Sequence, residues 1–191
     1  MNLIQRVLAI FLVMFFISIC LTQQVRSEST DADNSLFIIL AEQGDVNAQW
    51  VLGFMYLNGE GMPQNYKQAA YWLTKAAEQG FALAQFNLGF MYDNGKGVPQ
   101  DDQKALDWYK KAALQGLAEA QTNLGVMYAA DQSALQDYAI AYSWFNLAAL
   151  QGNELGRKNR NLILTNMSSS QIKEGQILST ALYEKIDNQA R

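Results

Sequence analysis

The chain contains no histidine and a single cysteine, Cys20, among its 191 residues. The lack of histidine excludes imidazole catalysis and histidine-based metal sites. No thiol nucleophile or disulfide is available beyond residue 20. A serine hydrolase without histidine would need a Ser-Lys pair, and no motif places one. The sequence therefore predicts no catalytic residues, no cofactor and no metal ion.

Acidic residues cluster at one point, where Asp101, Asp102 and Asp107 lie at the start of a predicted helix. Paired carboxylates could act on a glycan or a β-lactam, which keeps an envelope enzyme as an alternative function. We interpret these residues instead as carboxylates that complement the helix dipole.

Glycine pairs occur as Gly59-x-Gly61 and Gly95-x-Gly97. Such spacing is also found in phosphate-binding loops, but no strand precedes either pair, and the pair recurs in successive repeats. We interpret both as turns between helices.

These residues belong to a 36-residue repeat. Comparing residues 48–80 with 84–116 gives 19 identities in 33, and residues 120–152 keep 16 of 33 against the second copy. A repeat of this period indicates stacked units that cannot bury their apolar faces alone. The repeated positions are Ala48, Leu52, Gly53, Tyr56, Trp72 and Gly80 in the first copy, Ala84, Leu88, Gly89, Tyr92, Trp108 and Gly116 in the second, and Ala120, Leu124, Gly125, Tyr128, Trp144 and Gly152 in the third.

Each unit is predicted to form two helices, so the fold class is all-α. Apolar and small residues at helical spacing predict first helices at 46–58, 82–94 and 118–130 and second helices at 66–79, 102–115 and 138–151. A half-repeat at 35–44 precedes the full units 45–80, 81–116 and 117–152, and a C-terminal cap follows at 153–187. A capping-box pattern at Ser168-Ser169-Ser170-Gln171 predicts the start of the last helix.

The N-terminus differs from the array. The apolar run from Val7 to Leu21 follows Arg6 and has the length of a signal-peptide core, so residues 1–27 are predicted to be a signal peptide, or an N-terminal anchor if they are not cleaved. Residues 28–34 are expected to be a flexible tether. Because all 18 acidic residues but only 12 of the 14 basic ones lie beyond residue 27, that part carries a formal charge of −6, a poor fit to nucleic acid.

The pattern Ala48-x-x-x-Leu52-Gly53-x-x-Tyr56-x-x-Gly59-x-Gly61, followed by Ala69-x-x-Trp72-x-x-x-Ala76-Ala77-x-x-Gly80, resembles the Sel-one-like repeat, a relative of the tetratricopeptide repeat. The resemblance covers residues 35–187. It implies a right-handed α-solenoid, with first helices along a concave face, that serves as a scaffold for protein partners, often in bacterial envelopes. A cysteine-rich branch of the family is linked to β-lactams, but these repeats contain no cysteine.

Tetratricopeptide-like geometry would turn one aromatic stripe toward the concave face. Its predicted partner-binding residues are Trp50, Phe54, Leu57, Phe86 and Phe90, with Thr122 and Val126 at the same places in the third copy. An exposed stripe would bind a protein or peptide, whereas tight curvature would bury it between units. Both alternatives stay open at this point.

We therefore expect a non-enzymatic scaffold that binds a protein or peptide partner, located in the periplasm or secreted, or anchored in the inner membrane. A purely structural, membrane-anchored spacer is a further alternative. The sequence does not define the oligomeric state.

Overall fold

A computed structural model describes residues 34–130 and 137–190. The predicted signal peptide or anchor, and all of the tether except Asn34, lie outside the described residues. Residues 34–42 are helical, and eight further helices follow. These are α2 (Val46–Asn58), α3 (Tyr66–Glu78), α4 (Ala82–Asn94), α5 (Asp102–Leu114), α6 (Ala118–Ala130), α7 (Tyr138–Leu150), α8 (Glu154–Leu164) and α9 (Ser169–Ala190). The described part of the chain contains no strand.

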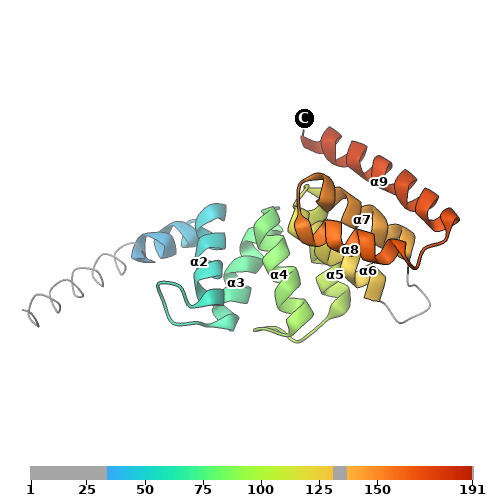
Figure 1. Ribbon diagram of the computed structural model, residues 1–191. Helices are drawn as coiled ribbons and strands as arrows, with labels where there is room; N and C mark the ends of the chain where they lie inside the picture. The colour runs from blue at the N-terminus through green and yellow to red at the C-terminus, as the bar shows by residue number, and fades with distance from the viewer. Residues whose placement is uncertain (1–33, 131–136, 191) are drawn as a thin grey trace, which may run out of the picture.

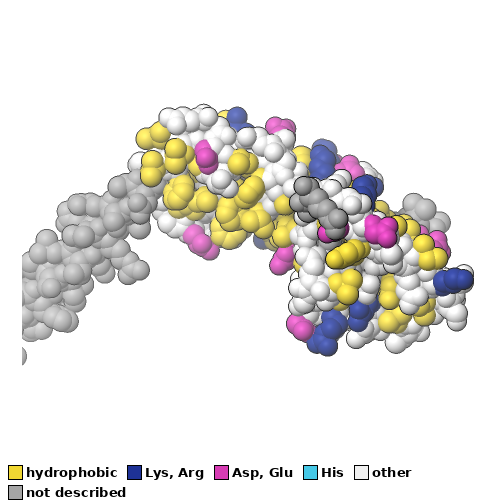
Figure 2. All heavy atoms as spheres, turned by 90° about the horizontal axis from the view of Figure 1, so that it is seen from above, with side chains coloured by type: hydrophobic (Ala, Val, Ile, Leu, Met, Phe, Trp, Pro, Cys, Tyr) yellow, Lys and Arg dark blue, Asp and Glu magenta, His cyan; other side chains and the backbone are white. Residues whose placement is uncertain are grey.

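The helices stack as consecutive antiparallel pairs, α2 with α3, α4 with α5, and α6 with α7 (Figure 1). This is an all-α solenoid, as the repeat predicts. We call the surface formed by α2, α4, α6 and α8 the first-helix face. Seen from above, the array arches (Figure 2).

Side-chain caps and glycines fix the helix ends. Asp45 Oδ1 accepts a hydrogen bond from the Ala48 N–H at 2.7 Å, and Asn65 accepts from two N–H groups of α3. At the other end of α2, Gly59 has φ +75° and donates its N–H to the Met55 carbonyl. This left-handed conformation favours glycine, so the turn interpretation of the glycine pairs is confirmed.

Close helix contact within each pair depends on one glycine of the first helix. A Cβ atom at Gly53 would lie 2.7 Å from Leu73 Cγ, and one at Gly89 would lie 2.8 Å from the Tyr109 ring. At Gly125 the nearest atoms belong to Phe145, also at 2.7 Å. The repeated glycines therefore allow backbones to approach the buried side chain of the partner helix.

The other repeated positions form most of the core. The repeated alanines and leucines of the first helices are at most 3% exposed. Trp144 and Trp72 are 3% and 8% exposed, whereas Trp108 is only half-buried and holds Lys111 Nζ 3.8 Å from its ring. The repeated tyrosines Tyr56, Tyr92 and Tyr128 are half-buried against core clusters.

Buried glutamines join successive units. Gln85 Nε2 donates to the Ala77 carbonyl of the preceding unit at 3.1 Å, and Gln115 Nε2 donates to Gln85 Oε1 at 2.8 Å. The same pairing recurs one unit earlier and one unit later, through Gln49 with Gln79 and Gln121 with Gln151. This polar ladder satisfies side chains that are buried between units.

The two ends differ from the prediction in detail. Asn34, placed in the tether, is helical, and its Nδ2 donates to the Gly61 carbonyl at 2.7 Å. The C-terminal helix continues past residue 187 to Ala190. The Ser168 capping box is present, because Ser168 Oγ accepts from the Gln171 N–H and the Gln171 side chain accepts from the Ser168 N–H.

The last helix does not pair with α8. It packs mainly on α7, where Gly175 allows close approach to Tyr142, and Leu182 and Ile186 join the core around α5. The first-helix side of α8 is therefore left uncovered by α9. Over residues 34–130 and 137–190, no helix has the length and apolar character needed to span a membrane.

Candidate interaction surface

The first pair of the aromatic stripe is half-buried. The ring centroid of Trp50 lies 5.7 Å from that of Phe54 and 5.5 Å from that of Phe81, which begins the next unit. The Trp50 Nε1 atom is buried and has no hydrogen-bond partner among the described residues. Trp50 also packs against the core cluster around Leu73, so it contributes to the stacking of units.

The second pair behaves similarly. Phe86 lies 5.7 Å from the Tyr109 ring, measured between centroids, and packs against the core cluster of α5 and α6. Phe90 is half-buried, and Lys96 Nζ lies 4.8 Å from its ring centroid. All four aromatic residues are half-buried. Trp50, Phe86 and Phe90 pack against core clusters, and Phe54 contacts the Trp50 ring. The stripe therefore contributes to the packing between units and is also partly exposed.

Leu57 corrects the prediction. It is 8% exposed and belongs to the buried cluster with Leu73 and Leu88. The expectation that Leu57 extends a surface patch is therefore wrong, because the loop after α2 and the next unit enclose it. Thr122 is also buried, at 2% exposed, and its Oγ1 lies 3.2 Å from Asn153 Oδ1.

An apolar ladder runs along the first helices of the three units and continues onto α8. Phe54, Phe90, Val126 and Leu162 are spaced 36 residues apart on α2, α4, α6 and α8. Val126 is 42% exposed and Leu162 is 64% exposed. Sequence reasoning missed Leu162 because the identities fade after Gly152, although its spacing from Val126 was a usable signal.

Figure 2 shows that hydrophobic side chains also gather over the N-terminal half of the array. Leu36 and Ile39, on the helical half-repeat, are 54% and 51% exposed. No first helix precedes this half-repeat among the described residues, which leaves its apolar side chains without a neighbouring unit.

Two hollows flank Val126 on the first-helix face. The first, of about 630 Å³, lies among the ends of α4 and α6 and the start of α5, and its lining includes Phe90, Asp93, Asp102 and Asn123. The second, of about 290 Å³, lies between α6, α7 and α8 and includes Phe145, Leu162 and Asn166. Val126 and Ala130 line both, so the hollows are neighbours.

Carboxylates of the first hollow lie close enough to interact. Burial of Asp93 raises its pKa, and the negative charge of Asp102 raises it further, while a hydrogen bond from Tyr109 opposes the shift. The Tyr109 hydroxyl donates to Asp93 Oδ2 at 3.5 Å. The ionised form of Asp93 is therefore destabilised, and a nearby cation would stabilise it.

The acidic group at the start of α5 has a structural role at Asp101. Its Oδ1 accepts from the Lys104 N–H at 3.0 Å, and this hydrogen bond is the main reason that its pKa is lowered. Asp107 is exposed and accepts from Gln103 Nε2 at 3.2 Å. Asp101 is the N-cap of α5, a role that the sequence analysis did not assign to it.

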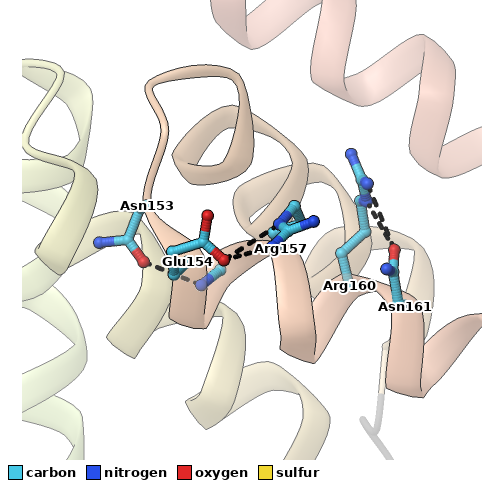
Figure 3. Close-up of polar contacts among 6 residues, drawn as sticks. Asn153, Glu154, Arg157, Arg160 and Asn161 are labelled. Carbon is cyan, nitrogen blue, oxygen red and sulfur yellow. Dashed lines mark hydrogen bonds and ion pairs between the residues drawn. The ribbon is translucent and has the colours of Figure 1, made fainter.

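The C-terminal end of the face is basic. On α8, Arg157 pairs with Glu154, Arg160 donates to Asn161, and Asn153 caps the helix (Figure 3). Arg160 also donates to Asn146 Oδ1 of α7 at 2.9 Å. Lys158 is exposed and occupies the place of Trp50, Phe86 and Thr122 in the earlier units. The face therefore changes from aromatic to basic along the array.

Comparison with protein families gives the same repeat units. The sequence model of the Sel1 repeat matches residues 46–81, 82–117 and 118–153, one residue later than the predicted unit boundaries. The chain belongs to the Sel1 repeat family. Sel1 repeats mediate protein–protein interaction, and Sel1 repeat scaffolds are in general non-catalytic. No curated protein matches the chain.

Solved structures of Sel1-type proteins are similar to this chain. A Sel1 repeat protein from Oxalobacter formigenes is 40% identical, with a TM-score of 0.60 over 68% of this chain and 97% of that one. The antigen c5321 of uropathogenic Escherichia coli, with a Sel1-like repeat fold, is 32% identical, with a TM-score of 0.54. That match covers 82% of this chain and only 42% of the antigen. Helicobacter pylori cysteine-rich protein B, at 22% identity and a TM-score of 0.53, covers 69% of this chain and 95% of that one and shares the fold.

Proposed function

We propose that this Sel1 repeat protein is an exported scaffold that binds another protein through its first-helix face. The observation that carries the proposal is the apolar ladder, whose members Val126 and Leu162 are 42% and 64% exposed. Large apolar side chains repeated along one exposed surface are typical of interaction sites. The family's general role in protein interaction supports the same conclusion.

Export is the second part of the proposal. It is supported by the basic residue Arg6 followed by the apolar run Val7 to Leu21. The expected compartment is the periplasm or the exterior, or the inner-membrane surface if the segment is retained. Mass spectrometry of the mature N-terminus decides between cleavage and anchoring.

Partner capture from an envelope extract tests the binding face. The full-length chain with Leu162→Glu should capture less partner, because a buried glutamate carboxylate at a binding surface is costly. Leu150→Glu is the matched control, since Leu150 is also 64% exposed but lies on α7, away from the first helices.

The expected result is loss of the partner with Leu162→Glu and retention with Leu150→Glu, while circular dichroism shows both variants folded. Equal capture by the two variants, or greater loss with Leu150→Glu, would contradict the proposed binding face.

A further inference from the structure

The two hollows beside Val126 differ in chemistry, which limits what can fill them together. The first hollow contains two carboxylates, Asp93 and Asp102. The second is lined mainly by apolar and aromatic side chains, among them Tyr138, Phe145 and Leu162. A partner that fills both must present a different group to each.

The carboxylates of the first hollow have no cationic partner among the described residues. Ion pairs join Lys104 with Asp101 and Arg157 with Glu154, and neither pair includes Asp93 or Asp102. Within the described ranges Asp93 accepts the long hydrogen bond from Tyr109, and Asp102 accepts from the Gln100 amide at 3.4 Å.

Neighbouring lysines contact aromatic rings and not these two carboxylates. Lys96 lies over the rings of Phe90 and Tyr66, and Lys104 lies 5.3 Å from the ring centroid of Tyr92. Two carboxylates bordered by the apolar side chains of Phe90 and Val126 suit the charged head and the methylene stem of a lysine or arginine.

Amide side chains line both hollows, Asn94 and Asn123 in the first and Asn159 and Asn166 in the second. An extended polypeptide leaves its backbone N–H and C=O groups free to pair with such amides, whereas a helix satisfies its own. Adjacent packed helices are separated by about 10 Å, which an extended chain at roughly 3.3 Å per residue spans in about three residues.

We propose that the first-helix face binds an extended segment of a partner protein. The segment places a lysine or arginine side chain in the hollow with Asp93 and Asp102, and an apolar side chain about three residues away in the hollow with Leu162. This inference rests on the proposed function and names the chemistry of the partner.

Selection from a displayed library of random 12-residue peptides on the full-length chain tests the inference. Enriched peptides should carry a basic and an apolar residue three positions apart. A synthetic peptide of that pattern, measured by fluorescence anisotropy, should bind on the order of tenfold more weakly to the double variant Asp93→Asn and Asp102→Asn, because hydrogen bonds to charged groups are lost.

Asp107→Asn is the matched control, because Asp107 is an exposed carboxylate on α5 that lines neither hollow. It should leave affinity unchanged. Higher salt should weaken binding to the wild-type chain more than to the double variant. The inference would be overturned if the enriched peptides lack a basic residue, or if their basic and apolar residues are seven positions apart, as on one face of a helix. It would also be overturned if Asp107→Asn weakens peptide binding as much as the double variant does.

Failure of this inference is distinguishable from failure of the proposed function. Peptides that bind equally well to the double variant but lose affinity with Leu162→Glu overturn the cation site and leave the binding face intact. A selection that yields no binder overturns the inference, and partner capture with Leu162→Glu and Leu150→Glu then decides the proposed function by itself.

Discussion

Replacing Gly97 by alanine should test how tightly successive units are stacked. Gly97 has φ +74°, and a Cβ atom there would lie 2.2 Å from the carbonyl oxygen of Tyr66, which begins the second helix of the preceding unit. Because the contact is with backbone, relief requires the inter-helix loop to move away from α3.

Gly61 is the equivalent position one unit earlier and provides the control. Its φ is +73°, but its added Cβ would meet the flexible Met55 Cε at 2.9 Å. Each alanine substitution costs about 1–2 kcal/mol because alanine is strained in the left-handed conformation. Alanine also reduces the conformational entropy of the unfolded chain, which offsets roughly 0.4–1 kcal/mol of that cost. Only Gly97→Ala adds an overpacking cost of about 1–3 kcal/mol.

Urea unfolding followed by circular dichroism measures the difference. Gly97→Ala should lower the free energy of unfolding by about 2–4 kcal/mol, and Gly61→Ala by about 1 kcal/mol. Equal losses in the two variants would refute the close approach of the loop to Tyr66, and with it this account of how the units stack.

Four further predictions concern burial and charge. Trp144→Ala should lower the free energy of unfolding by about 3–5 kcal/mol and Trp108→Ala by clearly less, measured by urea unfolding, because Trp144 is 3% exposed and Trp108 is half-buried. Leu57→Ala should cost about 2–5 kcal/mol in the same assay, since Leu57 is a core residue; a stable variant would contradict its burial. Asp93→Asn should raise the urea midpoint at pH 7 but not at pH 3, because a raised folded-state pKa makes the ionised form unfavourable above it. Asp101→Ala should lower the urea midpoint at pH 7 and lower it less at acidic pH. The lowered folded-state pKa of Asp101 gives stability that is present above the unfolded pKa and is lost as the pH falls through the folded value. If the midpoint difference between each variant and the wild-type chain is the same at high and at low pH, both pKa assignments are contradicted.

Much of the fold follows from the repeat itself. The first helices match the predicted ranges at both ends, because the left-handed Gly59 and Gly95 stop them and Asp45 caps the first. The predicted second helices are one residue too long, since Gln79, Gln115 and Gln151 are C-cap residues in the structure.

Other features depended on contacts between units that a single pattern does not reveal. Leu57 has apolar character and the right helical phase for a surface stripe, yet the following unit encloses it. The packing of α9 on α7 rather than on α8 is likewise set by Gly175 and Tyr142, which lie outside the repeated positions. The glutamine ladder was readable as a 36-residue repeat, but its role required the three-dimensional pairing of Gln85 with Gln115.

Site-specific photo-crosslinking in living cells tests the central claim most directly. A photoreactive phenylalanine analogue is placed at Leu162 on the first-helix face and, in a second strain, at the equally exposed Leu150 on α7. The account predicts a protein adduct from position 162 and none from position 150. An adduct from position 150, without one from position 162, would contradict binding through the first-helix face.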